Sequence, residues 1–342
     1  MREPPALADA TIVTALQASF GIRVAALVFL PIGNDAASWA YHVEAAQGPA
    51  YFLKVRAGGA GPMPGAAVPR HLHRHGVPNV LAPLATGAGA PYVLVDRFTL
   101  ALYPMLDAGV GAEVGLSPAQ WRQLGAALQQ IHRVPLTPEL TRMVGREAFR
   151  PTRRELVADL EALVATVAPD DPVAWELAGF WRARQGVIGA LVRQADALGQ
   201  HLARSSFPQV LCHADLHTWN VLVDADGQLW LVDWDEAVLA PKERDLMFVV
   251  GGGIGHKLVR PGDTDCFFQG YGQATVDPRL LAYYRCAWAV QDIAAYGEQV
   301  LLAPGLGEVT RRAAVEGLVD LFAPGNIIDL ARASDTTGPA GA

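Results

Sequence analysis

The segment from residue 211 to 236, LCHADLHTWNVLVDADGQLWLVDWDE, constrains the fold more than any other stretch of the sequence. Residues 220–223 and 229–232 are apolar or alternate in polarity, and the sequence DADG lies between them. Short apolar runs joined by a turn that contains glycine predict a β-hairpin. The loop before the first strand and Asp233 after the second strand therefore lie at the same end of this hairpin.

Polar side chains gather at that end of the hairpin in an order that suits phosphoryl transfer. Asp215 and Asn220 lie on the loop, shortly after His213, and Asp233 follows the second strand. In kinases a catalytic-loop Asp accepts the proton of the substrate hydroxyl, while an Asn on that loop and a later Asp hold Mg²⁺. Each of these residues alone is typical of an ordinary turn or strand end. Their combination predicts a kinase.

The chain before residue 107 contains a predicted hairpin and three further predicted strands. Residues 24–43 contain two apolar runs around a Gly33-Asn34-Asp35 turn, which predicts a hairpin, and further strands are expected at 50–55, 91–96 and 98–106. The small residues after the turn, as far as Ser38, would let backbone amides approach a phosphate group. This part of the chain therefore predicts an antiparallel sheet.

Lys54 interrupts the apolar strand at residues 50–55 and is the only lysine before Lys242. Such a lysine usually reaches solvent at a sheet edge, but in kinases a strand lysine binds the nucleotide phosphates. A glutamate on the following helix normally holds that lysine. No Asp or Glu occurs between Glu44 and Asp96. Either the partner is absent, or Glu44 or another residue takes its place.

The rest of the chain is predicted to be mainly helical. Helices are expected at residues 9–20, 66–75, 117–131, 152–166, 172–200, 264–273, 277–301 and 308–321. Strands followed mainly by helices predict an α+β fold with two lobes. The predicted lobes are a nucleotide-binding lobe at 1–106 and a catalytic and substrate-binding lobe at 107–333, with a disordered tail at 334–342.

Composition narrows the class of protein. The chain is 51% hydrophobic and 18% charged, with a formal net charge of −7, which favours a compact core and disfavours nucleic acid or an anionic membrane as partner. The N-terminal residues do not form a secretory signal, and no apolar run reaches the roughly 18 residues that a membrane span needs. Three cysteines without metal-type spacing are typical of a reducing compartment, so we expect a cytoplasmic protein.

The motifs HADLHTWN, VDW and Arg244-Asp245-Leu246 resemble those of the aminoglycoside phosphotransferase and choline kinase family. The resemblance covers about residues 20–325. It implies a bilobal protein-kinase-like fold, with a small antiparallel-sheet lobe and a larger, mostly helical lobe. It also implies an enzyme that uses ATP and Mg²⁺ to phosphorylate an alcohol group of a small molecule. We expect this enzyme to be a monomer.

The same resemblance assigns roles to the residues that match the motifs. Asp215 would be the catalytic residue, His213 would support the loop, and Asn220 and Asp233 would hold Mg²⁺. Lys54 would bind ATP phosphates together with the turn near Ser38. Backbone groups near Tyr103 and Met105 would receive the adenine.

Within this family, the stretches FLPIGNDAASWAYHV and LVDWDEAVLAPKERDLMFVVGGG look most similar to the spectinomycin phosphotransferases, which implies a cationic aminocyclitol as acceptor. Asp235 would point into the cleft or belong to a solvated acidic turn. Tyr284, Trp288 and Asp292 recur every four positions and therefore share one helix face. They would form an aromatic wall with a carboxylate, or an ordinary core stripe that ends in a surface acid.

Two alternatives stay open on the sequence. One is a metabolic kinase for choline, a sugar or an amino alcohol, which keeps the chemistry and changes the acceptor. The other is a catalytically silent nucleotide-binding module, which the missing helix glutamate would explain.

Overall fold

The computed structural model describes residues 3–33, 35–58, 63–250, 259–303 and 305–334. The chain divides into two compact units, and each is assembled from several segments. Unit 1 comprises Met1–Leu116, Arg133–Gly145 and His213–Ala237, and unit 2 comprises Ser117–His132, Arg146–Cys212 and Val238–Ala342. These units are divided differently from the predicted lobes, because the hairpin segment belongs with the N-terminal sheet.

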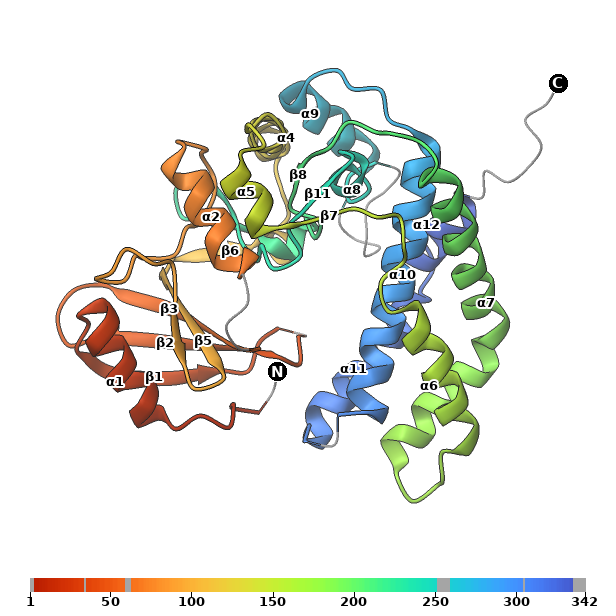
Figure 1. The fold of residues 1–342 in the computed structure, drawn as a ribbon, viewed down its shortest axis with the longest axis horizontal. Helices are drawn as coiled ribbons and strands as arrows, with labels where there is room; N and C mark the ends of the chain where they lie inside the picture. The colour runs from red at the N-terminus through yellow and green to blue at the C-terminus, as the bar shows by residue number, and fades with distance from the viewer. Residues whose placement is uncertain (1–2, 34, 59–62, 251–258, 304, 335–342) are drawn as a thin grey trace. The chain divides into compact units, whose positions relative to one another are not determined.

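Unit 1 contains a five-stranded antiparallel sheet with the strand order β1-β2-β3-β5-β4 (Figure 1). Its strands are β1 (Val24–Leu30), β2 (Ser38–Ala45), β3 (Ala50–Ala57), β4 (Val93–Val95) and β5 (Phe98–Pro104). The sheet lies where the alternating apolar stretches predict it. In the middle of the sheet Lys54 pairs with Ala40 on one side and with Ala101 on the other.

The two faces of this sheet carry different helices. Helix α1 (Asp9–Phe20) packs Ile12 and Leu16 into a core with alternate residues of β2, β3 and β5, among them Leu53 and Val55. Helix α2 (Pro64–Arg74) packs against the opposite face through Ala66, which contacts Ala101 and Tyr103. Because side chains alternate along a strand, Lys54 points to the α2 face.

The predicted hairpin is present as β9 (Val221–Asp224) and β10 (Leu229–Leu231), and β6 (Ala108–Val110) pairs with β9 to complete a second sheet. The short helices α3 (Gly111–Val114), α5 (Pro138–Met143) and η1 (Thr218–Asn220) also belong to unit 1. Three hydrogen bonds attach β10 to residues 79–81: Asn79 Nδ2 donates to Leu229 O (2.8 Å), Leu231 N to Asn79 O (2.7 Å), and Leu81 N to Leu231 O (3.2 Å). These bonds place the hairpin in unit 1.

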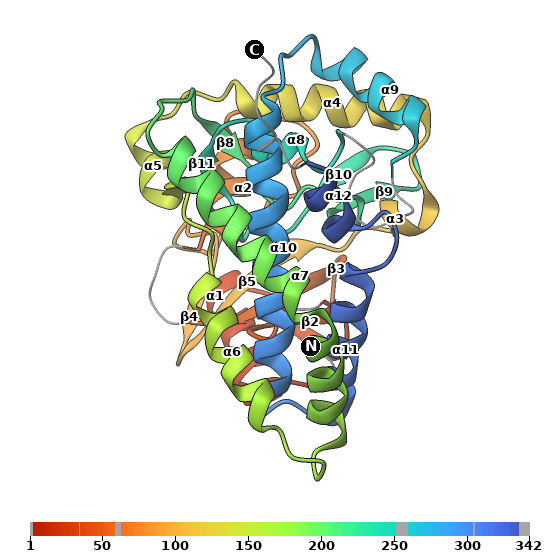
Figure 2. The same cartoon turned by 90° about the vertical axis from the view of Figure 1, so that its right-hand side faces the viewer.

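Unit 2 is mainly helical. Its helices are α4 (Pro118–His132), α6 (Arg154–Thr166), α7 (Pro172–Leu202), α8 (Glu243–Leu246), α9 (Pro261–Tyr271), α10 (Pro278–Leu301), α11 (Glu308–Leu321) and α12 (Ile327–Ala333). Helix α10 packs against α6, α7, α11 and α12, and Figures 1 and 2 show it running alongside α7 and α6. Strands β7 (Gly145–Arg146), β8 (Val210–Cys212) and β11 (Val238–Ala240) form a small sheet in the order β7-β11-β8.

The predicted α+β class, with an antiparallel sheet early in the chain and a larger helical part after it, is confirmed. Each predicted helix is present, with ends shifted by a few residues. Asn34 of the predicted turn lies outside the described residues, as do residues 335–342 of the predicted tail. Ser334, the first residue of that tail, ends helix α12 and bonds to Leu330 O. Within the described ranges, no helix combines the length and the apolar character that crossing a membrane requires.

Helices α4 and α9 approach each other closely through two glycines. A Cβ atom at Gly125 would lie 2.1 Å from Phe267 O, and one at Gly270 would lie 1.9 Å from Arg122 O. Both obstacles are backbone atoms, which cannot move aside as a flexible side chain can. The absence of a side chain at these two positions therefore sets the spacing of the helix pair.

We predict that Gly125→Ala destabilises the protein by about 1–3 kcal/mol, because the added methyl group must push α4 and α9 apart. Gly186→Ala on α7 is the matched control, since a Cβ atom there meets nothing within 4 Å. The control should be neutral or stabilising, because alanine favours a helix over glycine by about 1 kcal/mol. Scanning calorimetry of both variants measures the difference, and equal stability of the two would contradict the close approach.

Candidate active site

Lys54 is held between two carboxylates of the segment that follows β10. Its Nζ atom lies 2.9 Å from Asp233 Oδ1 and 2.7 Å from Asp235 Oδ2. The Lys54 side chain is 15% exposed. Burial opposes the charge, but the two carboxylates outweigh it and raise the pKa of Lys54 above its ordinary value. Lys54 therefore stays an ammonium ion in a partly desolvated site, and it has the carboxylate partner that the sequence of α2 lacks.

Asp233 combines an unusual backbone with a stabilised charge. Its φ angle is +63°, a left-handed conformation that Asp adopts more readily than most residues. Burial would raise the pKa of the Asp233 carboxyl, but the charge and hydrogen bond of Lys54 lower it to about 2. The side chain is still 47% exposed. Asp233 is thus an ionised carboxylate with an open side, which suits a divalent cation.

The loop before β9 orients Asp215 with two neighbours. Asn220 Nδ2 donates to Asp215 O (2.8 Å) and to Asp215 Oδ2 (3.0 Å), and His217 Nε2 lies 3.3 Å from Asp215 Oδ1. Because the Nδ2 atom of Asn220 bonds to Asp215, the side-chain oxygen Oδ1 lies on the side of the amide away from these bonds. The backbone N–H of Val232 donates to the backbone carbonyl oxygen of Asn220 (3.1 Å), so Asn220 lies beside the residues that lead to Asp233. Amide and carboxylate oxygens are ligands that Mg²⁺ prefers, so these residues fit that ion.

His213 joins the same loop to the end of β10. Its Nε2 donates to Val232 O (2.9 Å), and its Nδ1 accepts the N–H of Asp215 (3.3 Å). The carbonyl can only accept, so the proton sits on Nε2. The ring is fully buried and lies 4.5 Å from the ring of Trp234, centroid to centroid. His213 therefore connects the loop that carries Asp215 to Val232, the residue before Asp233.

Arg56 also belongs to this site, and the sequence interpretation missed it. It lies two residues after Lys54 on β3, hence on the same face of the strand. Its Nη1 contacts Asp235 Oδ2 and lies 3.5 Å from Asp35 Oδ2. The signal in the sequence was its i+2 position relative to Lys54, but that spacing alone is common in strands.

Three residues predicted to bind the nucleotide lie on the five-stranded sheet or at its end. Ser38 begins β2 and pairs with Arg56, and its N–H donates to Asp35 O. Tyr103 is buried on β5, and its hydroxyl donates to Gly65 O (3.0 Å). The N–H of Met105 donates to Ala50 O (3.2 Å). An adenine ring would therefore need other backbone groups of this segment.

The predicted substrate residues fall into two groups. Asp235 lies in unit 1 against Lys54, where its side chain is 12% exposed. Tyr284, Trp288 and Asp292 lie on α10 in unit 2. Tyr284 and Trp288 are buried, at 1% and 8% exposed, with Tyr284 against Tyr283 and Trp288 against Phe248. The contacts of these two aromatics are those of a core stripe, and a substrate role for α10 stays a prediction.

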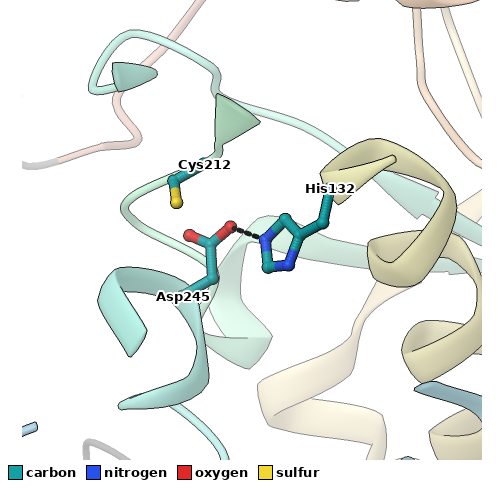
Figure 3. Close-up of side chains that lie close together, drawn as sticks. All are labelled: His132, Cys212 and Asp245. Atoms are coloured by element: carbon teal, nitrogen blue, oxygen red, sulfur yellow. Dashed lines mark hydrogen bonds and ion pairs between the residues drawn. The ribbon is translucent and has the colours of Figure 1, made fainter. Parts of the chain in front are cut away.

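A buried polar cluster in unit 2 contains the Asp of the Arg244-Asp245-Leu246 motif (Figure 3). His132 Nε2 lies 3.0 Å from Asp245 Oδ2, and His132 Nδ1 lies 2.7 Å from the Tyr271 hydroxyl. Cys212 completes a group whose ligand atoms all lie within 4.8 Å of one another. Burial raises the pKa of the Cys212 thiol well above its ordinary value, so the sulfur stays protonated and is a poor metal ligand. The hydrogen bonds of this cluster connect α4, α8 and α9.

Comparison with known proteins places this site in a family. The model of the phosphotransferase enzyme family matches residues 28–289. The crystal structure of spectinomycin phosphotransferase APH(9)-Ia, in complex with ADP and spectinomycin, is 30% identical to the chain and superimposes with a TM-score of 0.84. That match covers 96% of this chain and 99% of the other.

More distant structures share the fold. Amicoumacin kinase hAmiN, in complex with AMP-PNP, Ca²⁺ and Ami, is 17% identical with a TM-score of 0.62, covering 95% of this chain and 94% of the other. A choline/ethanolamine kinase family protein from Mesorhizobium loti is 14% identical with a TM-score of 0.51, covering 90% and 92%.

The chain belongs to the phosphotransferase enzyme family and has its protein-kinase-like fold. The resemblance inferred from the motifs is confirmed, and the protein is a small-molecule phosphotransferase. The silent-module alternative depended on a lysine without a carboxylate partner. Lys54 has two such partners, so that reason no longer applies.

The bonds of His213 lead to a prediction about stability. His213→Ala should lower the free energy of unfolding by about 2–4 kcal/mol, because it leaves Val232 O and the Asp215 N–H without their bonds and opens a cavity beside Trp234. His213→Gln should lose less, since the glutamine Nε2 can still donate to Val232 O. Urea unfolding of the two variants measures the difference, and an equal loss would argue against the hydrogen bond as the cause.

The lowered pKa of Asp233 leads to a prediction about pH. Because the folded-state pKa (about 2) is below the ordinary value of 3.8, the charge of Asp233 stabilises the fold fully above about pH 4, and this stabilisation is lost as pH falls toward 2. The difference in unfolding free energy between the parent and Asp233→Asn should be constant from about pH 7 to 5 and shrink below about 4. Urea titrations across this range test it. A difference that grows in acid would contradict the assigned sign.

Proposed function

We propose that the protein transfers the γ-phosphoryl group of ATP, with Mg²⁺, to a hydroxyl group of an aminocyclitol antibiotic, spectinomycin, and so gives resistance to it. The observation that carries the proposal is the 30% identity, over nearly the whole of both chains, to an enzyme whose crystal structure contains ADP and spectinomycin. The Lys54, Asp215, Asn220 and Asp233 arrangement supports the reaction type. A cationic acceptor also suits a chain with a net charge of −7.

Asp215 is the residue that we assign to the acceptor hydroxyl. Its carboxylate is 25% exposed and is oriented by Asn220 and His217, so it can receive a hydroxyl group on its open side. The oxygen of that hydroxyl forms a new bond to the γ-phosphorus while the bond from phosphorus to the bridging oxygen of ADP breaks. Asp215 accepts the hydroxyl proton. Because the transition state is loose, positioning contributes more than the strength of the base.

Lys54 is the residue that we assign to the phosphates of ATP. Its raised pKa keeps it charged at any pH at which the enzyme would act. Asn220 and Asp233 would hold Mg²⁺, which neutralises phosphate charge when bound. Partial desolvation around Lys54 strengthens its attraction to a phosphate, because the effective dielectric constant is lower than in water. These residues together supply the charge compensation that phosphoryl transfer needs.

Trp219 is a candidate contact for the acceptor. It precedes Asn220 on the catalytic loop, and it is 53% exposed although it is a large aromatic residue. An exposed indole face can bind an ammonium group through a cation–π interaction. This exposure supports a role for Trp219 at the acceptor.

A metabolic kinase for choline or a related amino alcohol is the second candidate. The observation in its favour is the shared fold with a choline/ethanolamine kinase family protein, at 14% identity. Both candidates use Asp215 and the same nucleotide, and both fit a monomeric, cytoplasmic enzyme. Only the acceptor separates them.

Purified protein with Mg·ATP and spectinomycin should form ADP and a spectinomycin product that carries one added phosphoryl group. Asp215→Asn should lower kcat by about 10²–10⁴-fold, because the amide keeps the bond to Asn220 but cannot accept a proton. Mass spectrometry of the antibiotic and a coupled ADP assay measure the two effects.

A panel that also contains choline, ethanolamine and sugars is the control for acceptor identity. Turnover of one of these compounds without turnover of spectinomycin would reject the proposed substrate. Asp226→Asn, on the exposed turn between β9 and β10, is the matched control for the loss of a charge and should retain full activity.

A further inference from the structure

Kinases of this fold normally hold the strand lysine with a glutamate on the next helix, and this chain has none. Helix α2 follows β3, yet no Asp or Glu occurs between Glu44 and Asp96. A partly buried ammonium group without a fixed partner would be costly and would adopt several positions. Some other residue must therefore position Lys54.

Asp233 is close to Lys54, but it is the carboxylate that we assign to Mg²⁺. Its side chain is about half exposed, whereas that of Asp235 is 12% exposed. A carboxylate that also binds a metal ion attracts Lys54 less strongly, because the metal ion partly neutralises its negative charge. Lys54 therefore needs a second, dedicated anion when the nucleotide is bound.

Both carboxylate oxygens of Asp235 face the interior of unit 1. Oδ2 contacts Lys54 Nζ and Arg56 Nη1, the two cations on the same face of β3. Oδ1 faces helix α2 at Gly65, where an added Cβ atom would lie only 1.8 Å away. The hydroxyl of Tyr103 bonds to Gly65 O and so fixes that position of the helix against β5. Asp235 thus occupies the space beside the lysine that a helix side chain would otherwise fill.

We propose that Asp235 is the positioning residue for Lys54, in place of a helix glutamate, and that glycine at position 65 makes room for it. Arg56 supports this role, because it balances the charge of Asp235 and holds its carboxylate toward the sheet. The role replaces direct contact between Asp235 and the substrate, since neither carboxylate oxygen is directed away from these neighbours. The inference rests on the proposed nucleotide site and does not depend on the identity of the acceptor.

A double-mutant cycle on nucleotide affinity tests the proposal, with Mg·ADP as the probe in isothermal titration calorimetry. Asp235→Asn should weaken Mg·ADP binding by about 10- to 100-fold, as expected when a phosphate-binding group is misplaced. In a Lys54→Met background the same substitution should change the affinity by less than about threefold, because the group that it positions is gone. Equal losses in both backgrounds would overturn the proposal.

The second test places a carboxylate on helix α2 in place of the one at position 235. Asp235→Ala removes the group, and Gly65→Glu alone should also weaken Mg·ADP binding, because its side chain collides with Asp235. The double variant, Asp235→Ala with Gly65→Glu, should bind at least about tenfold more tightly than either single variant. Thermal unfolding of each variant, with Asp226→Asn as the charge control, distinguishes loss of the folded structure from displacement of the Lys54 side chain.

Steady-state kinetics distinguish this proposal from the proposed function. If the parent protein binds Mg·ADP but does not phosphorylate spectinomycin, the acceptor assignment fails and the calorimetric cycle still tests Asp235. If the parent turns over spectinomycin, Asp235→Asn should raise KM for ATP and leave KM for spectinomycin unchanged. A raised KM for spectinomycin with unchanged Mg·ADP affinity would overturn the positioning role.

Discussion

The ammonium group of Lys54 between Asp233 and Asp235 is the interaction on which the rest of the site depends. A lone ammonium group at 15% exposure would lose much of its hydration, and the nearby carboxylates compensate for that loss. The two acids lie 179 and 181 residues later in the sequence, so this contact joins the central strand of the N-terminal sheet to the catalytic segment. The positive charge of Lys54, which we assign to the nucleotide phosphates, is thus stabilised by residues of a different chain segment in the same unit.

Neutral hydrogen bonds hold those acids in place. Asn79 and Leu81 bond to the backbone of β10, His213 bonds to Val232, and the N–H of Val232 bonds to Asn220. None of these bonds involves the side-chain carboxylate of Asp233 or Asp235. The position of the carboxylates is therefore set by the backbone around the hairpin, and binding of a cation or a phosphate can draw on charges that are already placed.

Local patterns predicted the parts of the site that are close in sequence. The loop with Asp215 and Asn220, the hairpin and Asp233 follow from spacing and turn chemistry within one segment. The carboxylate partner of Lys54 could not be predicted, because it depends on a distant loop meeting a helix that has a glycine at position 65. The sequence also did not predict how the chain divides into units. The hairpin joins unit 1 partly through the pairing of β6 with β9, and β6 has only three residues and shows no periodicity.

Asp235 lies on the same loop as Asp233, the residue that we assign to the metal ion, and this arrangement has a mechanical consequence. A glutamate on a helix can move with that helix, independently of the metal site. Here Trp234 alone separates Asp233 from Asp235, and its ring is buried against His213. A displacement of the backbone at Asp233 would therefore also displace Asp235, so the carboxylate assigned to the metal and the carboxylate that positions Lys54 lie on one short segment of unit 1. The precision of the nucleotide site then depends on how well Trp234 is packed, as well as on the position of Gly65 in α2.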